Sequence, residues 1–145
     1  MIEQQAHAVW RGGLKEGSGS FRSGSLSDKY SFSSRFEDGI GSSPEELIGA
    51  ALASCFSMAL ALFLEGHGDT PDTIETTATV YLDPQRLLIA RIELETEAEV
   101  HGLSDSAFQE CAEQAKKNCP VSKALSGVEI LLKSARLKHV AVKRA

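Results

Sequence analysis

The chain of 145 residues is 42% hydrophobic and 24% charged, an ordinary globular composition, and we expect one domain spanning residues 1–145. Its formal net charge of −5 argues against nucleic-acid binding, which requires clustered lysine and arginine in excess. The first eleven residues lack the apolar run of a secretory signal, so the sequence predicts a cytoplasmic protein.

Short strands are expected in the N-terminal third, which is rich in glycine and serine. Segments 8–10, 20–22 and 30–32 carry apolar and aromatic side chains, and Gly/Ser/Asp turns separate them. They predict a small antiparallel meander. The segment Phe32 to Phe36, which contains Arg35, is expected to continue as a strand.

A long helix is predicted between Ser43 and Gly66. Ser43 has the features of an N-cap, Pro44 suits the first helical position, and Glu46 follows at the third, as in a capping box. Residues 47–64 are uncharged but have acidic flanks and no basic anchor, so we expect a helix enclosed by other elements and no membrane span.

The remaining segments predict two long strands, a helix and a last strand. Residues 74–82 and 92–100 alternate around a turn at 83–85, with the acidic row of the second strand on a solvated face. A helix over 106–118 carries an apolar stripe, and a short helix and a strand over 128–132 follow. This order indicates an α+β fold, with residues 138–145 as a tail or strand extension.

The cysteines are the candidate reactive groups. Cys55, on the long helix, becomes nucleophilic only beside a cation, and Arg35 is the candidate because a guanidinium does not lose its proton. Cys119 precedes Pro120 and is expected at the N-cap of the short helix, where amide hydrogens stabilise a thiolate. Cys111 shares the apolar stripe and is expected to be structural. The alternative for all three is plain core packing.

Glu45 lies ten helical residues before Cys55, about 15 Å along the axis and roughly 80° around it. One straight helix therefore cannot bring both into one site. If Glu45 serves Cys55, it does so across a two-fold dimer with antiparallel helices. Charge compensation at the helix N-terminus would equally account for an acid at this position.

Bound cofactors are not predicted. The four histidines show no metal-ligand spacing with one another or with cysteine, which argues against a zinc site. Neither a Walker motif nor a GxGxxG motif is present, which argues against a nucleotide site of those kinds.

Two motifs resemble those of the OsmC/Ohr family of osmotically induced and organic-hydroperoxide-resistance proteins. The first is SPEELIGAALASCFSMAL at residues 43–60, and the second is KNCPVS at residues 117–122. Arg35-Phe36-Glu37 is similar to the arginine segment of the OsmC branch. The likeness extends from Trp10 to about Leu132.

This resemblance implies an OsmC-like fold, with antiparallel sheets wrapped around long central helices in an intertwined homodimer. It also implies a peroxidase of organic hydroperoxides, with Cys55 as the attacking thiol and Cys119 as the resolving thiol. Arg35 and Glu45 would be the activating pair. A Cys55 sulfenic acid would condense with Cys119 to a disulfide, which an external dithiol reduces without metal or cofactor. Two alternatives stay open: a non-catalytic dimeric stress or ligand-binding protein, and a thiol–disulfide exchanger that never meets peroxide.

Overall fold

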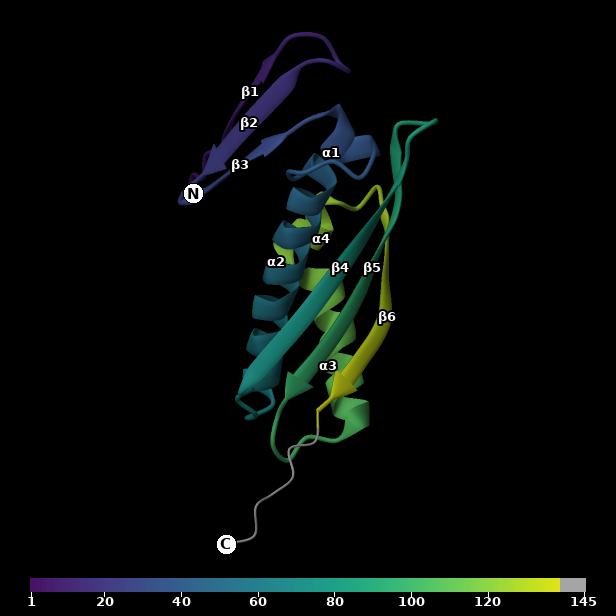
Figure 1. Ribbon diagram of the computed structural model, residues 1–145. Coiled ribbons are helices and arrows are strands. Elements are labelled where there is room, and N and C mark those ends of the chain that lie inside the picture. The colour runs from purple at the N-terminus through teal and green to yellow at the C-terminus, as the bar shows by residue number, and fades with distance from the viewer. Residues whose placement is uncertain (139–145) are drawn as a thin grey trace, which may run out of the picture. The chain divides into compact units, whose positions relative to one another are not determined.

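The computed structural model describes residues 1–138, which divide into two compact units (Figure 1). The first unit is Met1–Leu47 and the second begins at Ile48. The first unit contains β1 (His7–Arg11), β2 (Ser18–Ser23), β3 (Leu26–Tyr30) and α1 (Phe32–Phe36), and α2 (Pro44–Gly66) begins in it. The second contains the rest of α2, β4 (Thr73–Asp83), β5 (Leu88–Glu99), α3 (Asp105–Asn118), α4 (Pro120–Ala124) and β6 (Glu129–Leu137).

The predicted N-terminal meander is confirmed as an antiparallel sheet of order β1-β2-β3, but its third strand is Leu26–Tyr30 and not residues 30–32. Trp10, Gly19 and Tyr30 are cross-strand partners, and the two aromatic rings approach to 5.4 Å between centroids. A Cβ added to Gly19 would lie 2.5 Å from the Tyr30 ring. The absence of a side chain at this position therefore lets the rings pack over the middle strand.

Residues 32–36 form helix α1, so the prediction of a strand there was wrong. Ser31 is the N-cap: its Oγ accepts a hydrogen bond from the Ser34 amide at 3.0 Å. The Ser34 Oγ in turn accepts from the Ser31 amide at 2.8 Å, which completes a capping box. These two serines, three positions apart, outweigh the strand preference of the flanking phenylalanines.

Helix α2 has the boundaries that its sequence predicts. The Ser43 Oγ accepts from the Glu46 amide at 3.1 Å, and Gly66 is the last helical residue. By length and composition the helix could cross a membrane. Within the second unit, one stripe of α2 is buried, whereas Met58 and Leu62 on another face are 77% and 65% exposed.

The second sheet has the order β4-β5-β6 and is mixed. Strands β4 and β5 form the predicted hairpin, but β6 pairs parallel with β5, which corrects the expectation of purely antiparallel sheets. A parallel neighbour needs a crossover, and α3 and α4 supply it. The α+β class and the OsmC-like fold are unaffected.

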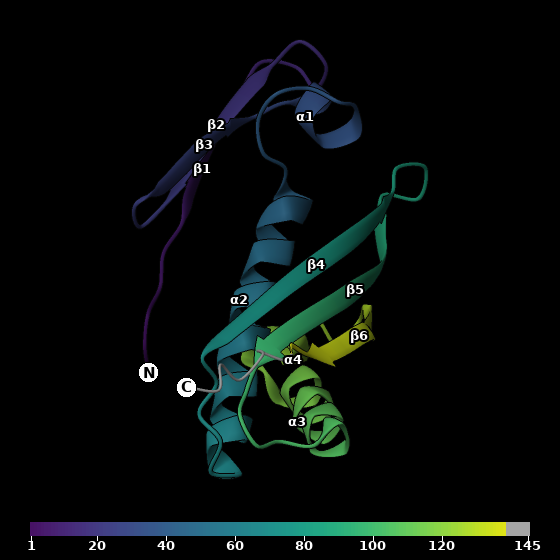
Figure 2. The same cartoon turned by 60° about the horizontal axis from the view of Figure 1, so that its bottom comes forward.

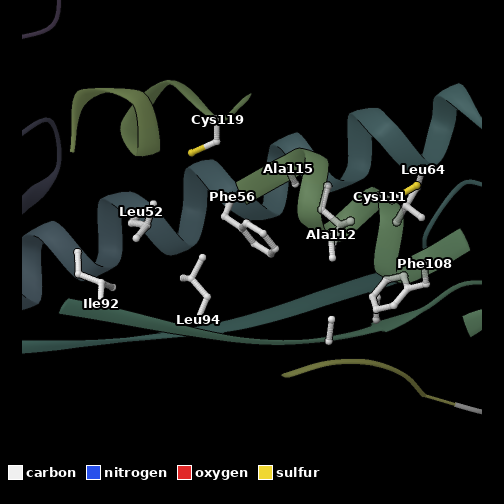
Figure 3. Close-up of a cluster of buried hydrophobic side chains, with 13 residues drawn as sticks. Leu52, Phe56, Leu64, Ile92, Leu94, Phe108, Cys111, Ala112, Ala115 and Cys119 are labelled. Carbon is white, nitrogen blue, oxygen red and sulfur yellow. The ribbon is translucent and has the colours of Figure 1, made fainter. Parts of the chain in front are cut away.

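The core of the second unit lies between this sheet and the helices on one of its faces (Figure 2). Helix α2 contributes a leucine and phenylalanine stripe, β5 contributes alternate residues, and α3 contributes the stripe predicted from its sequence (Figure 3). Fully buried members are Leu52, Phe56, Leu60, Leu64, Ile92, Leu94, Phe108, Cys111, Ala112, Ala115 and Cys119.

The opposite face of this sheet is charged, as the alternation in β5 predicts. Its acidic row is paired with basic residues of β6 and the residue after it: Glu93 with Lys133, Glu97 with Arg136, and Glu99 with Lys138. These are half-exposed ion pairs, each contributing little to stability.

The predicted tail, residues 138–145, lies outside the described residues except for Lys138, whose amide donates to the Ala98 carbonyl at 2.8 Å. The single domain over residues 1–145 stays a prediction.

Candidate active site

Cys55 and Cys119 lie together in the second unit as free thiols. Cys55 projects from α2 and is partly exposed, whereas Cys119 is fully buried in the core. Each side chain shifts the pKa of the other: Cys119 raises the pKa of Cys55, and Cys55 lowers the pKa of Cys119. The second unit therefore brings together the two thiols that the sequence separates by 64 positions.

Cys119 occupies the junction between α3 and α4, as its position before Pro120 predicts. It is both the C-cap of α3 and the N-cap of α4, with an extended backbone at φ −64° and ψ 134°. The Ser122 amide and the Ser122 hydroxyl each donate to the Cys119 sulfur at 3.4 Å. A negative charge on this sulfur is therefore stabilised by two hydrogen-bond donors.

The two thiols have pKa values shifted in opposite directions. Burial raises the pKa of Cys55, and the hydrogen bond and charge of Cys119 raise it further. Burial also acts to raise the pKa of Cys119, but hydrogen bonds from Cys55 and from Ser122 outweigh it and lower that pKa. Within this pair the proton therefore stays on Cys55, and an attacking Cys55 thiolate requires a further cation.

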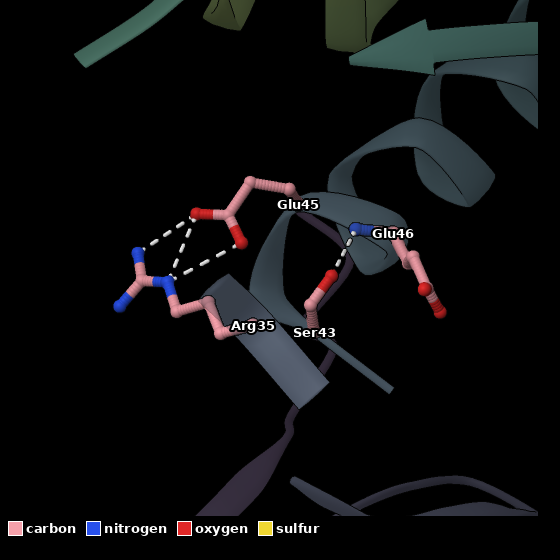
Figure 4. A network of polar contacts seen from close by, with 4 residues as sticks. All are labelled: Arg35, Ser43, Glu45 and Glu46. Atoms are coloured by element: carbon pink, nitrogen blue, oxygen red, sulfur yellow. Dashed lines mark hydrogen bonds and ion pairs between the residues drawn. The ribbon is translucent and has the colours of Figure 1, made fainter. Parts of the chain in front are cut away.

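Arg35 and Glu45 form an ion pair within the first unit (Figure 4). The arginine Nη2 and Nε both donate to the Glu45 carboxylate, at 2.8 Å and 3.1 Å to Oε1. Nε lies 3.3 Å from Oε2 as well. The Glu45 side chain is only 9% exposed, whereas that of Arg35 is 40% exposed. The guanidinium is thus oriented by a buried carboxylate and still presents an open edge.

Cys111 is a core residue, as expected from its stripe. It is fully buried beside Leu64 (Figure 3). Burial raises its pKa, and the charges of Glu110 and Asp69 raise it further. A protonated, enclosed thiol of this kind is unreactive.

Two groups of polar residues escaped the sequence interpretation. Ser122 follows Cys119 by three positions, the spacing between an N-cap residue and the amide that it caps. This spacing was the only sequence signal that pointed to Ser122. A buried chain of hydroxyls also links Ser57 of α2 to Thr76 and Thr96 of the sheet, at 2.8 Å and 3.0 Å. Its members are far apart in sequence, so no local pattern marks them.

No group of three or more His, Cys, Asp or Glu side chains within residues 1–138 is arranged to hold a metal ion. The described residues offer two thiols in the second unit and an ion pair of a guanidinium and a carboxylate in the first unit.

Comparison with known proteins identifies the family. The sequence model of the OsmC-like proteins matches residues 37–133, a range that includes Glu45, Cys55 and Cys119. The chain belongs to the OsmC family. It is 46% identical to the peroxiredoxin OsmC of Escherichia coli K12, over 86% of this chain and 90% of that protein.

Solved structures of OsmC-family proteins share the fold. An OsmC-like protein from Mycoplasma pneumoniae superposes with a TM-score of 0.73 at 18% identity, covering 94% of this chain and 99% of that one. The organic hydroperoxide resistance protein OhrB of Bacillus subtilis gives 0.61 at 25% identity, with 92% and 98% covered.

Proposed function

We propose that this OsmC-family protein is a thiol-dependent peroxidase that reduces organic hydroperoxides to alcohols in defence against oxidative or osmotic stress. The observation that carries the proposal is that Cys55 and Cys119 lie close enough to shift each other's pKa, with Cys55 partly exposed and Cys119 buried in the core. The 46% identity to a protein named peroxiredoxin supports the reaction class. The likeness to an organic hydroperoxide resistance protein supports the substrate class.

The oxidative half of the reaction uses only the two thiols. The Cys55 thiolate attacks one oxygen of the hydroperoxide O–O bond, the alkoxide leaves and takes a proton, and Cys55 becomes a sulfenic acid. The Cys119 thiolate then attacks the Cys55 sulfur and displaces water after proton transfer to the hydroxyl, which forms a disulfide. The lowered pKa of Cys119 supports its role as the second nucleophile.

The Cys55 thiolate needs a cation, and Arg35 supplies it in this proposal. The bidentate contact with buried Glu45 keeps the guanidinium in one orientation. The sequence indicates that, if Glu45 serves Cys55, it does so from a second copy of the chain. We therefore place the Arg35–Glu45 pair of one protomer beside Cys55 of its partner.

A homodimer also accounts for the exposed stripe of α2. Met58 and Leu62 present apolar surface on the helix that carries Cys55. Two such helices packed antiparallel around a two-fold axis cover each other's stripe.

The same apolar surroundings favour an organic hydroperoxide over hydrogen peroxide. We place the protein in the cytoplasm, where an external dithiol reduces the disulfide.

The test is peroxide consumption in the presence of a dithiol, with four proteins compared. Cys55→Ser is expected to abolish turnover, and Cys119→Ser to allow oxidation but impair recycling. Cys111→Ser is the matched control and is expected to retain turnover. Cumene hydroperoxide should give a higher kcat/KM than hydrogen peroxide.

Two results would refute the proposal. Negligible turnover of the wild type would favour the non-catalytic binding protein with packed cysteines. Thiol–disulfide exchange without a trappable sulfenic acid at Cys55 would favour the exchanger.

A further inference from the structure

The two sulfurs differ in how an external molecule reaches them. Cys119 is fully buried among core side chains, whereas Cys55 is partly exposed on α2. A thiolate attacks a disulfide along the line of the two sulfurs, from the side opposite the bond that breaks. Of these two residues, only Cys55 has solvent-exposed surface in this chain, because the core encloses Cys119.

The buried sulfur is also the one with hydrogen-bond donors. The Ser122 hydroxyl and the Ser122 amide both lie 3.4 Å from the Cys119 sulfur, and Ser122 itself is only 8% exposed. Neither donor competes with bulk water for its partner, so both stay directed at the sulfur. Hydrogen bonds to a charged sulfur stabilise it more than hydrogen bonds to a neutral one.

We propose that the reductant attacks the Cys55 sulfur of the disulfide and that Ser122 stabilises the Cys119 sulfur as the leaving thiolate. This inference rests on the proposed peroxidase cycle and assigns a residue and a direction to its reductive half. The dithiol's thiolate forms a bond to the Cys55 sulfur, and the electron pair of the broken S–S bond goes to Cys119. The second thiol of the reductant, as thiolate, then attacks the reductant sulfur in the mixed disulfide. Cys55 is released as a thiolate that takes up a proton, and the reductant leaves as a cyclic disulfide.

The lower pKa of Cys119 agrees with this direction, because a sulfur that holds negative charge more readily leaves faster. A Ser122 that only caps α4 would behave differently. Its removal would alter stability, but it would not change which sulfur accepts the reductant or the pH at which Cys119 ionises.

The first experiment locates the mixed disulfide. The wild type is oxidised to the Cys55–Cys119 disulfide with diamide, exposed briefly to glutathione as a monothiol, quenched in acid and mapped by mass spectrometry. The glutathione adduct is expected on Cys55. An adduct predominantly on Cys119 would overturn the assigned direction. Since no peroxide is used, this result is independent of whether the protein is a peroxidase.

The second experiment tests Ser122 itself. Single-turnover reduction of the disulfide by dithiothreitol is expected to slow about three- to tenfold in Ser122→Ala, because the leaving sulfur loses a donor. Ser122→Thr keeps the hydroxyl and is expected to restore the rate. Ser126→Ala, at an exposed position of the same segment, is the matched control and should not change it.

A third measurement separates chemistry from folding. In the Cys55→Ser background, thiolate absorbance at 240 nm should show Cys119 ionising at higher pH once Ser122→Ala is added. An unchanged reduction rate together with an unchanged ionisation midpoint would overturn the role of Ser122. A loss of rate that Ser126→Ala shares would overturn it as well.

Discussion

The hydroxyl chain between α2 and the second sheet predicts a non-additive effect of mutation. Ser57 donates to Thr76, and Thr96 donates to the Glu75 carbonyl at 3.2 Å. Since the Thr96 proton is used there, Thr76 donates to Thr96 at 3.0 Å. Thr96→Val removes that acceptor and leaves the proton of the Thr76 hydroxyl without an acceptor. We expect a loss of about 1–2 kcal/mol in the free energy of unfolding, the usual cost of a partly buried hydrogen-bond donor that has no acceptor.

Adding Thr76→Val should recover part of this loss, because it removes the stranded hydroxyl. Ser57 then keeps an acceptor, the Ala53 carbonyl, which lies 2.8 Å from its Oγ. Urea unfolding at one fixed protein concentration measures the cycle, with Thr77→Val on the exposed face of β4 as control. A double variant as unstable as the sum of the single variants would refute the reasoning.

Three further outcomes are expected. Cys119→Ala should move the alkylation profile of Cys55 by iodoacetamide to lower pH, since Cys119 raises the pKa of Cys55; an unmoved midpoint contradicts this. Burial raises the pKa of Cys111 in the folded protein above its value in the unfolded chain. Between these two pKa values the unfolded chain loses the proton and the folded protein keeps it, so the free energy of unfolding falls as the pH rises. Cys111→Ala should flatten this alkaline fall in urea titrations. Gly19→Ala should destabilise the first sheet, seen as faster amide exchange there, because a Cβ meets the Tyr30 ring.

Elements with strong local signals were predictable from the sequence. Helix α2 starts after Ser43 and ends at Gly66 because capping and stop residues act within one turn. The stripe of α3 follows from helical periodicity alone. Helix α1 was missed because its stability depends on two reciprocal serine hydrogen bonds, whereas its phenylalanines have the composition of a strand.

Contacts between residues far apart in the sequence were harder to predict. The parallel pairing of β6 depends on where the crossover returns the chain, which no local pattern encodes. The N-cap position of Cys119 was predictable from Pro120, but the order of the two thiol pKa values was not, because it arises from contacts with Cys55 and Ser122. The charge of its guanidinium made Arg35 a candidate, and the family resemblance paired it with Glu45; their ion pair is a finding of the structure.

The separation of Cys55 and Cys119 along the chain also sets a time interval between their syntheses. Cys119 follows Cys55 by 64 positions, so at about 5–20 residues per second it leaves the ribosome roughly 3–13 s later. Over that interval a growing chain holds Cys55 without the thiol that would close a disulfide on it. Under the proposed cycle, any sulfenic acid that forms at Cys55 during that interval has no Cys119 thiol to condense with, and further peroxide oxidises it irreversibly. In the proposed cycle, protection of Cys55 by disulfide formation therefore begins only after the C-terminal part of the chain has been made.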